Sequence, residues 1–107
     1  MATFADAIRF EILVNGQRRC VAGFEGPGVM SVITDWVIRD PQKKPADFTI
    51  DAWTKQSLHC HVGGLSSAAN QAMSWLSEDL AVGDEVTIRV LGPGSFDEPL
   101  HKSKDNF

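Results

Sequence analysis

The stretch LAVGDEVTIRVL, residues 80–91, decides the fold class of this chain. At 86–90 it reads Val-Thr-Ile-Arg-Val, so apolar and polar side chains alternate with the period of a strand that buries one face. A Val-Gly-Asp turn at 82–84 precedes this strand. Gly-Pro-Gly at 92–94 ends it, because proline cannot donate to the ladder. The upstream chain must therefore bury apolar faces against this strand or its neighbours.

Length and composition indicate one acidic domain. A chain of 107 residues is long enough for a single core and too short for two. Its apolar fraction of 43% is close to the globular average and argues against disorder. Ten Lys and Arg against fourteen Asp and Glu give a net charge of −4. We therefore expect no nucleic-acid partner, because binding to a phosphate backbone needs clustered positive charge.

The sequence predicts a cytoplasmic chain with no membrane contact. No segment approaches the roughly 18 apolar residues of a membrane span. The opening MATFADAIRF lacks the basic and apolar regions of a signal peptide. Cys20 and Cys60 are too few for a disulfide framework, and both lie in apolar runs. We expect two reduced, buried thiols.

The Asn-Gly pair at 15–16 predicts a β-hairpin over residues 8–22. A two-residue turn would place Glu11 opposite Cys20 and mix polar with apolar side chains. A three-residue loop would place Glu11 opposite Arg19, which pairs opposite charges on one face and keeps the other face mostly apolar. We therefore expect the three-residue loop, with Glu11 and Arg19 as cross-strand neighbours.

The middle of the chain is rich in strand signals. Residues 29–38, VMSVITDWVI, fit either a helix face or a strand, and their β-branched side chains favour a long, largely buried strand. Residues 48–53 and 58–62 alternate as two strands joined by a turn at 54–56.

The segment 66–79 is the best helix candidate. A serine at its start can cap the helix, and several apolar side chains fall on one stripe. The alternation of Gln71, Met73 and Trp75 leaves a short edge strand as the other interpretation. Near the C-terminus, residues 95–107 are polar and predict a flexible tail.

Together these elements predict a mainly β fold. About five or six short strands with closely spaced turns are typical of an antiparallel β-sandwich or barrel, here a single domain over 1–107 with one short helix at 66–79. If 29–38 and 66–79 are both helical, the chain becomes an α+β fold with a ubiquitin-like sheet. Trp36 and Trp75 lie in apolar surroundings, so we expect them in the core.

No catalytic motif is present in the sequence. It contains no G-x-S-x-G elbow, dinucleotide fingerprint or phosphate-binding loop. Two histidines flank Cys60, but neighbours in a strand point to opposite faces and cannot activate its thiol. The acidic doublets at 78–79, 84–85 and 97–98 lie at turns or element ends rather than across a cleft. We therefore expect a non-enzymatic protein without a cofactor.

Asp51, Trp53, His59 and His61 are the candidate partner-binding residues. If 48–53 is a strand whose Phe48, Ile50 and Ala52 face the core, Trp53 faces outward beside the other three, as an interface hot spot does. His59 and His61 would share a face and could chelate a metal with Asp51 as a third ligand. A small metal-binding protein or metal-dependent enzyme is therefore one alternative function.

Four strings in the sequence resemble those of a family of small, uncharacterised bacterial cytosolic proteins. They are GVMSVITDW at 28–36, HVGGLSS at 61–67, LAVGDEVTIRVL at 80–91 and DEP at 97–99. The resemblance covers about residues 10–99, and its motifs are structural, so it assigns no catalytic residue. Proteins of this class often lie beside polymorphic toxins and act as immunity proteins that cover a toxin's active site.

The resemblance thus implies a non-enzymatic inhibitor of a protein partner, a toxin-neutralising immunity protein that binds a bacterial toxin domain. A structural β-module that oligomerises through an edge strand is a further alternative.

Overall fold

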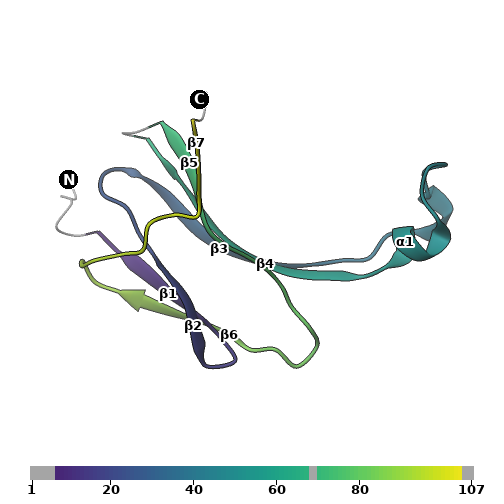
Figure 1. Cartoon of the computed structure of the whole chain (residues 1–107), viewed down its shortest axis with the longest axis horizontal. Helices are drawn as coiled ribbons and strands as arrows, with labels where there is room; N and C mark the ends of the chain where they lie inside the picture. The colour runs from purple at the N-terminus through teal and green to yellow at the C-terminus, as the bar shows by residue number, and fades with distance from the viewer. Residues whose placement is uncertain (1–6, 68–69, 105–107) are drawn as a thin grey trace.

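Antiparallel strands make up most of the computed structural model, which describes residues 7–67 and 70–104 (Figure 1). A three-stranded sheet has the order β2-β1-β6 and contains β1 (Arg9–Val14), β2 (Gln17–Ala22) and β6 (Val86–Leu91). A four-stranded sheet has the order β3-β4-β5-β7 and contains β3 (Gly28–Val37), β4 (Ser57–Ser66), β5 (Gln71–Asp79) and β7 (His101–Lys104). The short helices are η2 (Pro41–Lys43) and α1 (Ile50–Thr54). The mainly β fold with two antiparallel sheets is therefore confirmed.

The core lies between the two sheets. Its buried members are Ile12, Cys20, Ala22, Cys60, Val62, Met73, Trp75 and Leu76. Trp75 is 2% exposed and stacks on Phe24, with ring centroids 6.4 Å apart. Its indole Nε1 donates to the carbonyl of Asp97 at 2.9 Å. The prediction that Trp75 belongs to the core is confirmed, and both cysteines are buried as expected.

The first hairpin uses a two-residue turn followed by a bulge. Asn15 and Gly16 both have positive φ, 53° and 78°, as the primed turns of tight hairpins require. Ile12 faces Cys20, and the register shifts between Ile12 and Leu13. The bulge adds one residue to β2, so it returns Ile12 and Cys20 to one apolar face. The expected three-residue loop is wrong. It was expected because it places apolar residues of the two strands on one side of the hairpin, and the bulge in β2 does this instead.

The charged partners in this hairpin also differ from the prediction. Glu11 faces Val21 and not Arg19, so the predicted cross-strand pair is wrong. The carboxylate of Glu11 contacts Arg89 on β6 at 3.2 Å. Arg19 reaches Glu78 on β5 at 2.7 Å and so links the two sheets.

The two ambiguous segments are both strands. A strand over 29–38 is confirmed as β3, but the expectation that it is largely buried is wrong, since Trp36 is 60% exposed. The helix expected at 66–79 is also wrong, because this segment forms β5. The alternative interpretation as a strand is correct, but not as a short edge strand, since β5 lies inside the sheet between β4 and β7. The ubiquitin-like plan needed helices in both segments, and neither is helical.

Residues 48–53, predicted as a strand, enter α1 instead. The Thr49 hydroxyl oxygen accepts a hydrogen bond from the Ala52 N–H at 3.2 Å and caps the helix. This local cap outweighs the short alternation that suggested a strand. Within the described residues, no helix has the length and apolar character needed to cross a membrane.

β3 and β4 continue past the three-stranded sheet as a two-stranded arm (Figure 1). The arm carries residues 38–56, with η2 and α1, at its tip. The molecule measures 51 × 36 × 22 Å, and its Cα radius of gyration is 17.0 Å. A compact domain of this length has a radius of about 13 Å. The arm therefore makes the molecule elongated.

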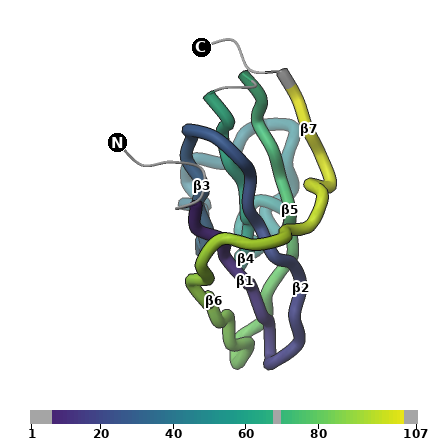
Figure 2. The backbone as a smooth tube through the Cα atoms, turned by 90° about the vertical axis from the view of Figure 1, so that its left-hand side faces the viewer, coloured from purple at the N-terminus to yellow at the C-terminus, as the bar shows by residue number. Residues whose placement is uncertain are grey.

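Residues 92–100 form a strap that crosses from β6 to β7 over the sandwich (Figure 2). The Val21 N–H donates to the Asp97 carboxylate at 2.8 Å, and the Asp97 N–H donates to the Val21 carbonyl at 2.9 Å. The segment 95–107, predicted as a flexible tail, is thus bonded to the body over its described residues and ends in β7. Residues 105–107 lie outside the described part of the chain.

Candidate functional site

The four predicted partner-binding residues lie in two separate places. Asp51 and Trp53 belong to α1 at the tip of the arm, whereas His59 and His61 lie on β4. The single face was inferred from a strand over 48–53, and this segment is helical. We therefore describe the tip and the histidines as separate candidate sites.

The tip patch consists of Phe48, Ile50, Asp51 and Trp53. Phe48 is 44% exposed and Ile50 is 49% exposed, and Asp51 is also exposed. Trp53 is half-buried and meets Phe48 edge to face, with centroids 5.4 Å apart. Its Nε1 donates to the carbonyl of Asp40 at 2.7 Å. The patch therefore exposes the side chains of Phe48 and Ile50, and the Trp53 indole that Phe48 contacts is held in place by its hydrogen bond to Asp40.

Two basic side chains hold the tip patch in place. The Arg39 guanidinium lies 5.4 Å from the centre of the Trp53 ring. The Lys44 ammonium donates to the carbonyls of Phe48 at 2.8 Å and Pro45 at 3.2 Å. These contacts order the patch without burying it, which reduces the entropy lost when a partner binds. In Figure 1 the tip is also the part of the arm farthest from the body.

The predicted histidines bond to the neighbouring strand β5. His59 Nε2 lies 2.9 Å from the Ser77 hydroxyl, and His59 Nδ1 lies 3.1 Å from the Asp79 carboxylate. His61 Nε2 lies 3.2 Å from the Ser74 hydroxyl. In the described part of the chain, no group of three or more His, Cys, Asp or Glu side chains could hold a metal ion.

Ser77, His59 and Asp79 stand in the order of a nucleophile, a base and an orienting acid. Sequence reasoning missed this chain of hydrogen bonds because it placed Ser77 and Asp79 in a helix. The three side chains lie on the outer face of the sheet, where Asp79 is 95% exposed and Ser77 is exposed. Acyl transfer relies on donors that stabilise the oxyanion in a site shielded from water. The arrangement therefore fits cross-strand bonding better than catalysis.

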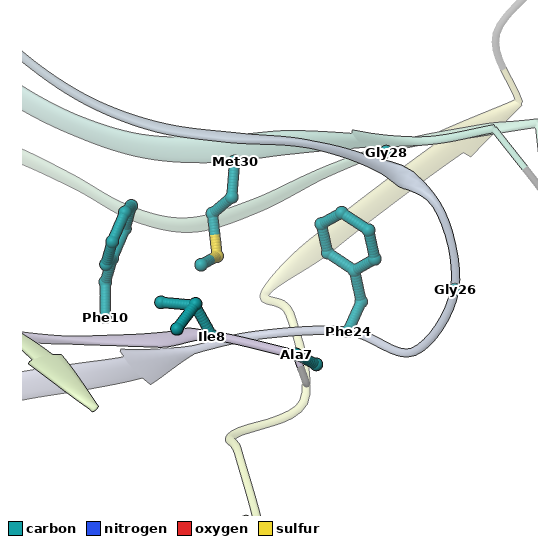
Figure 3. Close-up of a pocket in the computed structure, with 7 residues that line it drawn as sticks. All are labelled: Ala7, Ile8, Phe10, Phe24, Gly26, Gly28 and Met30. Carbon is teal, nitrogen blue, oxygen red and sulfur yellow. The ribbon is translucent and has the colours of Figure 1, made fainter. Parts of the chain in front are cut away.

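An apolar pocket of about 250 Å³ lies between the sheets beside the start of β3. We call it the edge pocket; its lining residues are Ala7, Ile8, Phe10, Phe24, Gly26, Gly28 and Met30. Figure 3 shows Met30 on one side of it and Ile8 and Phe10 on the other. None of the described residues that line it is charged, so this wall suits an apolar group. No sequence motif identifies this pocket, because its lining residues come from three segments of the chain, 7–10, 24–26 and 28–30.

Comparisons with known proteins give no relative for this chain: no protein-family model, curated protein or solved structure matches it. The family resemblance of its motifs therefore stays a prediction.

Proposed function

We propose that this chain is a non-enzymatic protein-binding protein that contacts its partner through the tip patch. The observation that carries this proposal is the exposure of Phe48 and Ile50 on a fixed support, 44% and 49%. Apolar side chains on a protruding, ordered element are typical of protein contact sites. Asp51 adds a negative charge beside them.

The more specific form of the proposal is a toxin-neutralising immunity protein in the bacterial cytoplasm. The net charge of −4 of the whole chain favours a basic protein partner, because complementary charge speeds association, although residues 38–56 themselves are nearly balanced, with four Lys and Arg and three Asp. A bacterial toxin domain that acts on nucleic acid would carry such positive charge at its active site. The arm could reach into the cleft of such a domain and cover it.

Metal binding at His59 and His61 has less support. Three of their four ring nitrogens already lie within hydrogen-bond distance of serine or aspartate side chains on β5. A metal ion would have to displace these bonds.

The test uses the purified product of the gene beside this one as the candidate partner. Phe48→Ala and Ile50→Ala should each weaken the complex by about thirtyfold or more, because truncating an anchor in an interface centre costs about 2 kcal/mol or more. Asp51→Ala should act mainly on the association rate. Val82→Ala is the matched control, since Val82 is 96% exposed in a turn of the body.

Calorimetric titration measures these affinities. An unchanged affinity in both Phe48→Ala and Ile50→Ala would move the interface away from the tip patch. A neighbouring gene product that does not bind the wild-type chain would contradict the immunity function.

A further inference from the structure

The free edge of β3 carries an inference that goes beyond the proposed function. β3 is an end strand of the four-stranded sheet, and over its ten residues β4 is the one strand that pairs with it in the described part of the chain. In natural proteins, proline, lysine, bulges or short length usually prevent an edge strand from pairing with a strand of another chain. β3 contains no proline or lysine, its pairing with β4 shows no bulge, and Asp35 is its single charged residue. An edge of this kind is a template for pairing with another strand.

We propose that two copies of this chain pair through their β3 edges, antiparallel about a two-fold axis at Ile33. In this register Ile33 faces its own copy, and both sandwiches lie on the same side of the joined sheet. The other facing pairs are Val29 with Val37, Met30 with Trp36, Ser31 with Asp35 and Val32 with Thr34. The register is self-complementary, because Val29 meets Val37, Met30 meets Trp36, and Asp35 meets the Ser31 hydroxyl.

Neighbouring registers lack this complementarity. An axis at Val32 would set Asp35 opposite the exposed Val29 of the second copy. An axis at Thr34 would set Asp35 opposite Ile33. An axis at Asp35 itself would bring two carboxylates face to face, which is destabilising. The charge of Asp35 therefore favours the axis at Ile33 over these three registers.

Trp36 supplies an anchor on the inner face of the joined sheet. It pairs with Leu58 of β4 on the core side of the sheet, yet it is 60% exposed because the arm extends beyond the body. Its Nε1 donates to Gln56 Oε1 at 2.9 Å, so the ring is held in position. In the dimer Trp36 lies beside Met30 of the second copy, which lines the edge pocket (Figure 3). Tryptophan is among the residues most enriched at the energetic centres of interfaces.

The open side of the sandwich offers further apolar surface. β3 and β6 lie on the same side of the sandwich (Figure 2). Ile88 and Val90 of β6 share a face with the buried Ile12, yet they are 47% and 67% exposed. The four-stranded sheet leaves this edge of the inner face uncovered. In the register above, the body of the second copy lies beside the arm of the first, next to this uncovered edge.

The chain exposes more surface than a compact monomer of its mass, so it has surface to bury in a dimer. The whole chain exposes 7389 Å² and has a mass of 11.7 kDa. A compact monomer of this mass exposes about 5,900 Å², a difference of about 1,500 Å². A standard interface takes about 800 Å² from each partner. The dimer would direct its two arms in opposite directions and so present two tip patches.

The first experiment measures the mass of the full chain by sedimentation equilibrium in the micromolar range. We expect twice the 11.7 kDa of one chain for the wild type. Ile33→Lys should give a monomer, because it places two ammonium groups together on the axis and guards the edge. Ile33 is 50% exposed, so the change should leave the fold intact, which circular dichroism verifies. Val82→Lys is the control with the same charge and should remain dimeric.

The second experiment tests the register by crosslinking. Ile33→Cys should form a disulfide-linked dimer with diamide as the oxidant, because facing residues of an antiparallel pair lie about 4.5–5.5 Å apart at Cα, within disulfide range. Ser31→Cys should not, because its two copies would lie about 13 Å apart along the strands. Cys20 and Cys60 do not compete, since both are buried.

A monomeric wild type, or a dimer unaffected by Ile33→Lys, would overturn the proposal. Crosslinking of Ser31→Cys as fast as Ile33→Cys would overturn the register.

Discussion

Asn15 joins two turns that lie far apart in the sequence. Its side-chain amide donates to the Asp84 carboxylate at 2.9 Å, and its side-chain oxygen accepts from the Glu85 N–H at 3.0 Å. Its own N–H donates to the Glu85 carbonyl at 2.9 Å. Asn15 thus contributes both the left-handed backbone of the first turn and a link to the segment before β6.

Asn15→Gly should lower the free energy of unfolding by about 1–3 kcal/mol, since glycine keeps the backbone conformation but loses two side-chain hydrogen bonds. Urea denaturation measures this change. Val82→Ala, at an exposed position, should stay within about 0.5 kcal/mol of the wild type. Equal stability of Asn15→Gly and the wild type would show that the link contributes nothing.

Asp84 makes stability depend on pH. Hydrogen bonds from the Asn15 amide and the Ala81 N–H hold the pKa of Asp84 below its usual value of 3.8. A carboxylate with a depressed pKa stabilises the fold above that usual value, and this stabilisation is lost as the pH falls toward the folded-state pKa. Asp84→Asn should therefore be less stable than the wild type at neutral pH, and the gap should narrow below about pH 4. Urea unfolding at several pH values measures it, and a gap independent of pH would contradict the account.

Ser77 tests the non-enzymatic assignment. Because Ser77 and Asp79 are open to water, we expect no covalent labelling of the native chain by a fluorophosphonate probe, read by mass spectrometry. Labelling that disappears in Ser77→Ala and in His59→Ala would instead identify an activated nucleophile. That result would replace the binding function with a hydrolytic one.

Trp75 is the side chain through which β5 contributes most to the core. Trp75→Ala should cost about 3–5 kcal/mol of stability, because it removes a buried ring that stacks on Phe24. Trp75→Phe should cost less, since an aromatic ring remains but the hydrogen bond to the Asp97 carbonyl is lost. Leu100→Ala is the exposed control. A cost of Trp75→Ala below about 1 kcal/mol would contradict the assigned core.

The strands that sequence reasoning identified are those in which apolar and polar residues alternate over several positions and a turn sequence marks the end of the strand. β6 is flanked by Gly83 and Gly92, and the first hairpin by its Asn-Gly pair. The preferred interpretation made β5 a helix, because its apolar residues fit a helical stripe as well as a strand. Neither the bulge in β2 nor the cap at Thr49 has a strong sequence signal, so register and α1 could not be predicted.

The candidate site was predicted in part. Asp51 and Trp53 do lie at an exposed element, although in a helix rather than a strand. Phe48 and Ile50 were missed because the strand interpretation assigned them to a buried face. The exposure of Trp36 could not be predicted, because the apolar composition of β3 gives no indication that the strand extends beyond the body.

On the scale of the whole molecule, a small sandwich supports one long arm. The body holds the buried core, and the strap bonds to both sheets across it. The arm adds little to that core but accounts for the 51 Å length of the molecule (Figure 1). Ordering an extension whose apolar side chains stay exposed makes folding of the free chain less favourable, and it reduces the entropy lost when a partner binds.

Hydrogen exchange of the chain with and without the neighbouring gene product tests this account most directly. The account predicts added protection at residues 38–56, the tip of the arm, and no change at the histidine-bearing outer face of β4 and β5. The tip backbone is the appropriate probe because few of its amides pair with a strand. Protection confined to β4 and β5, with the tip unchanged, would contradict the claim that the arm carries the binding site.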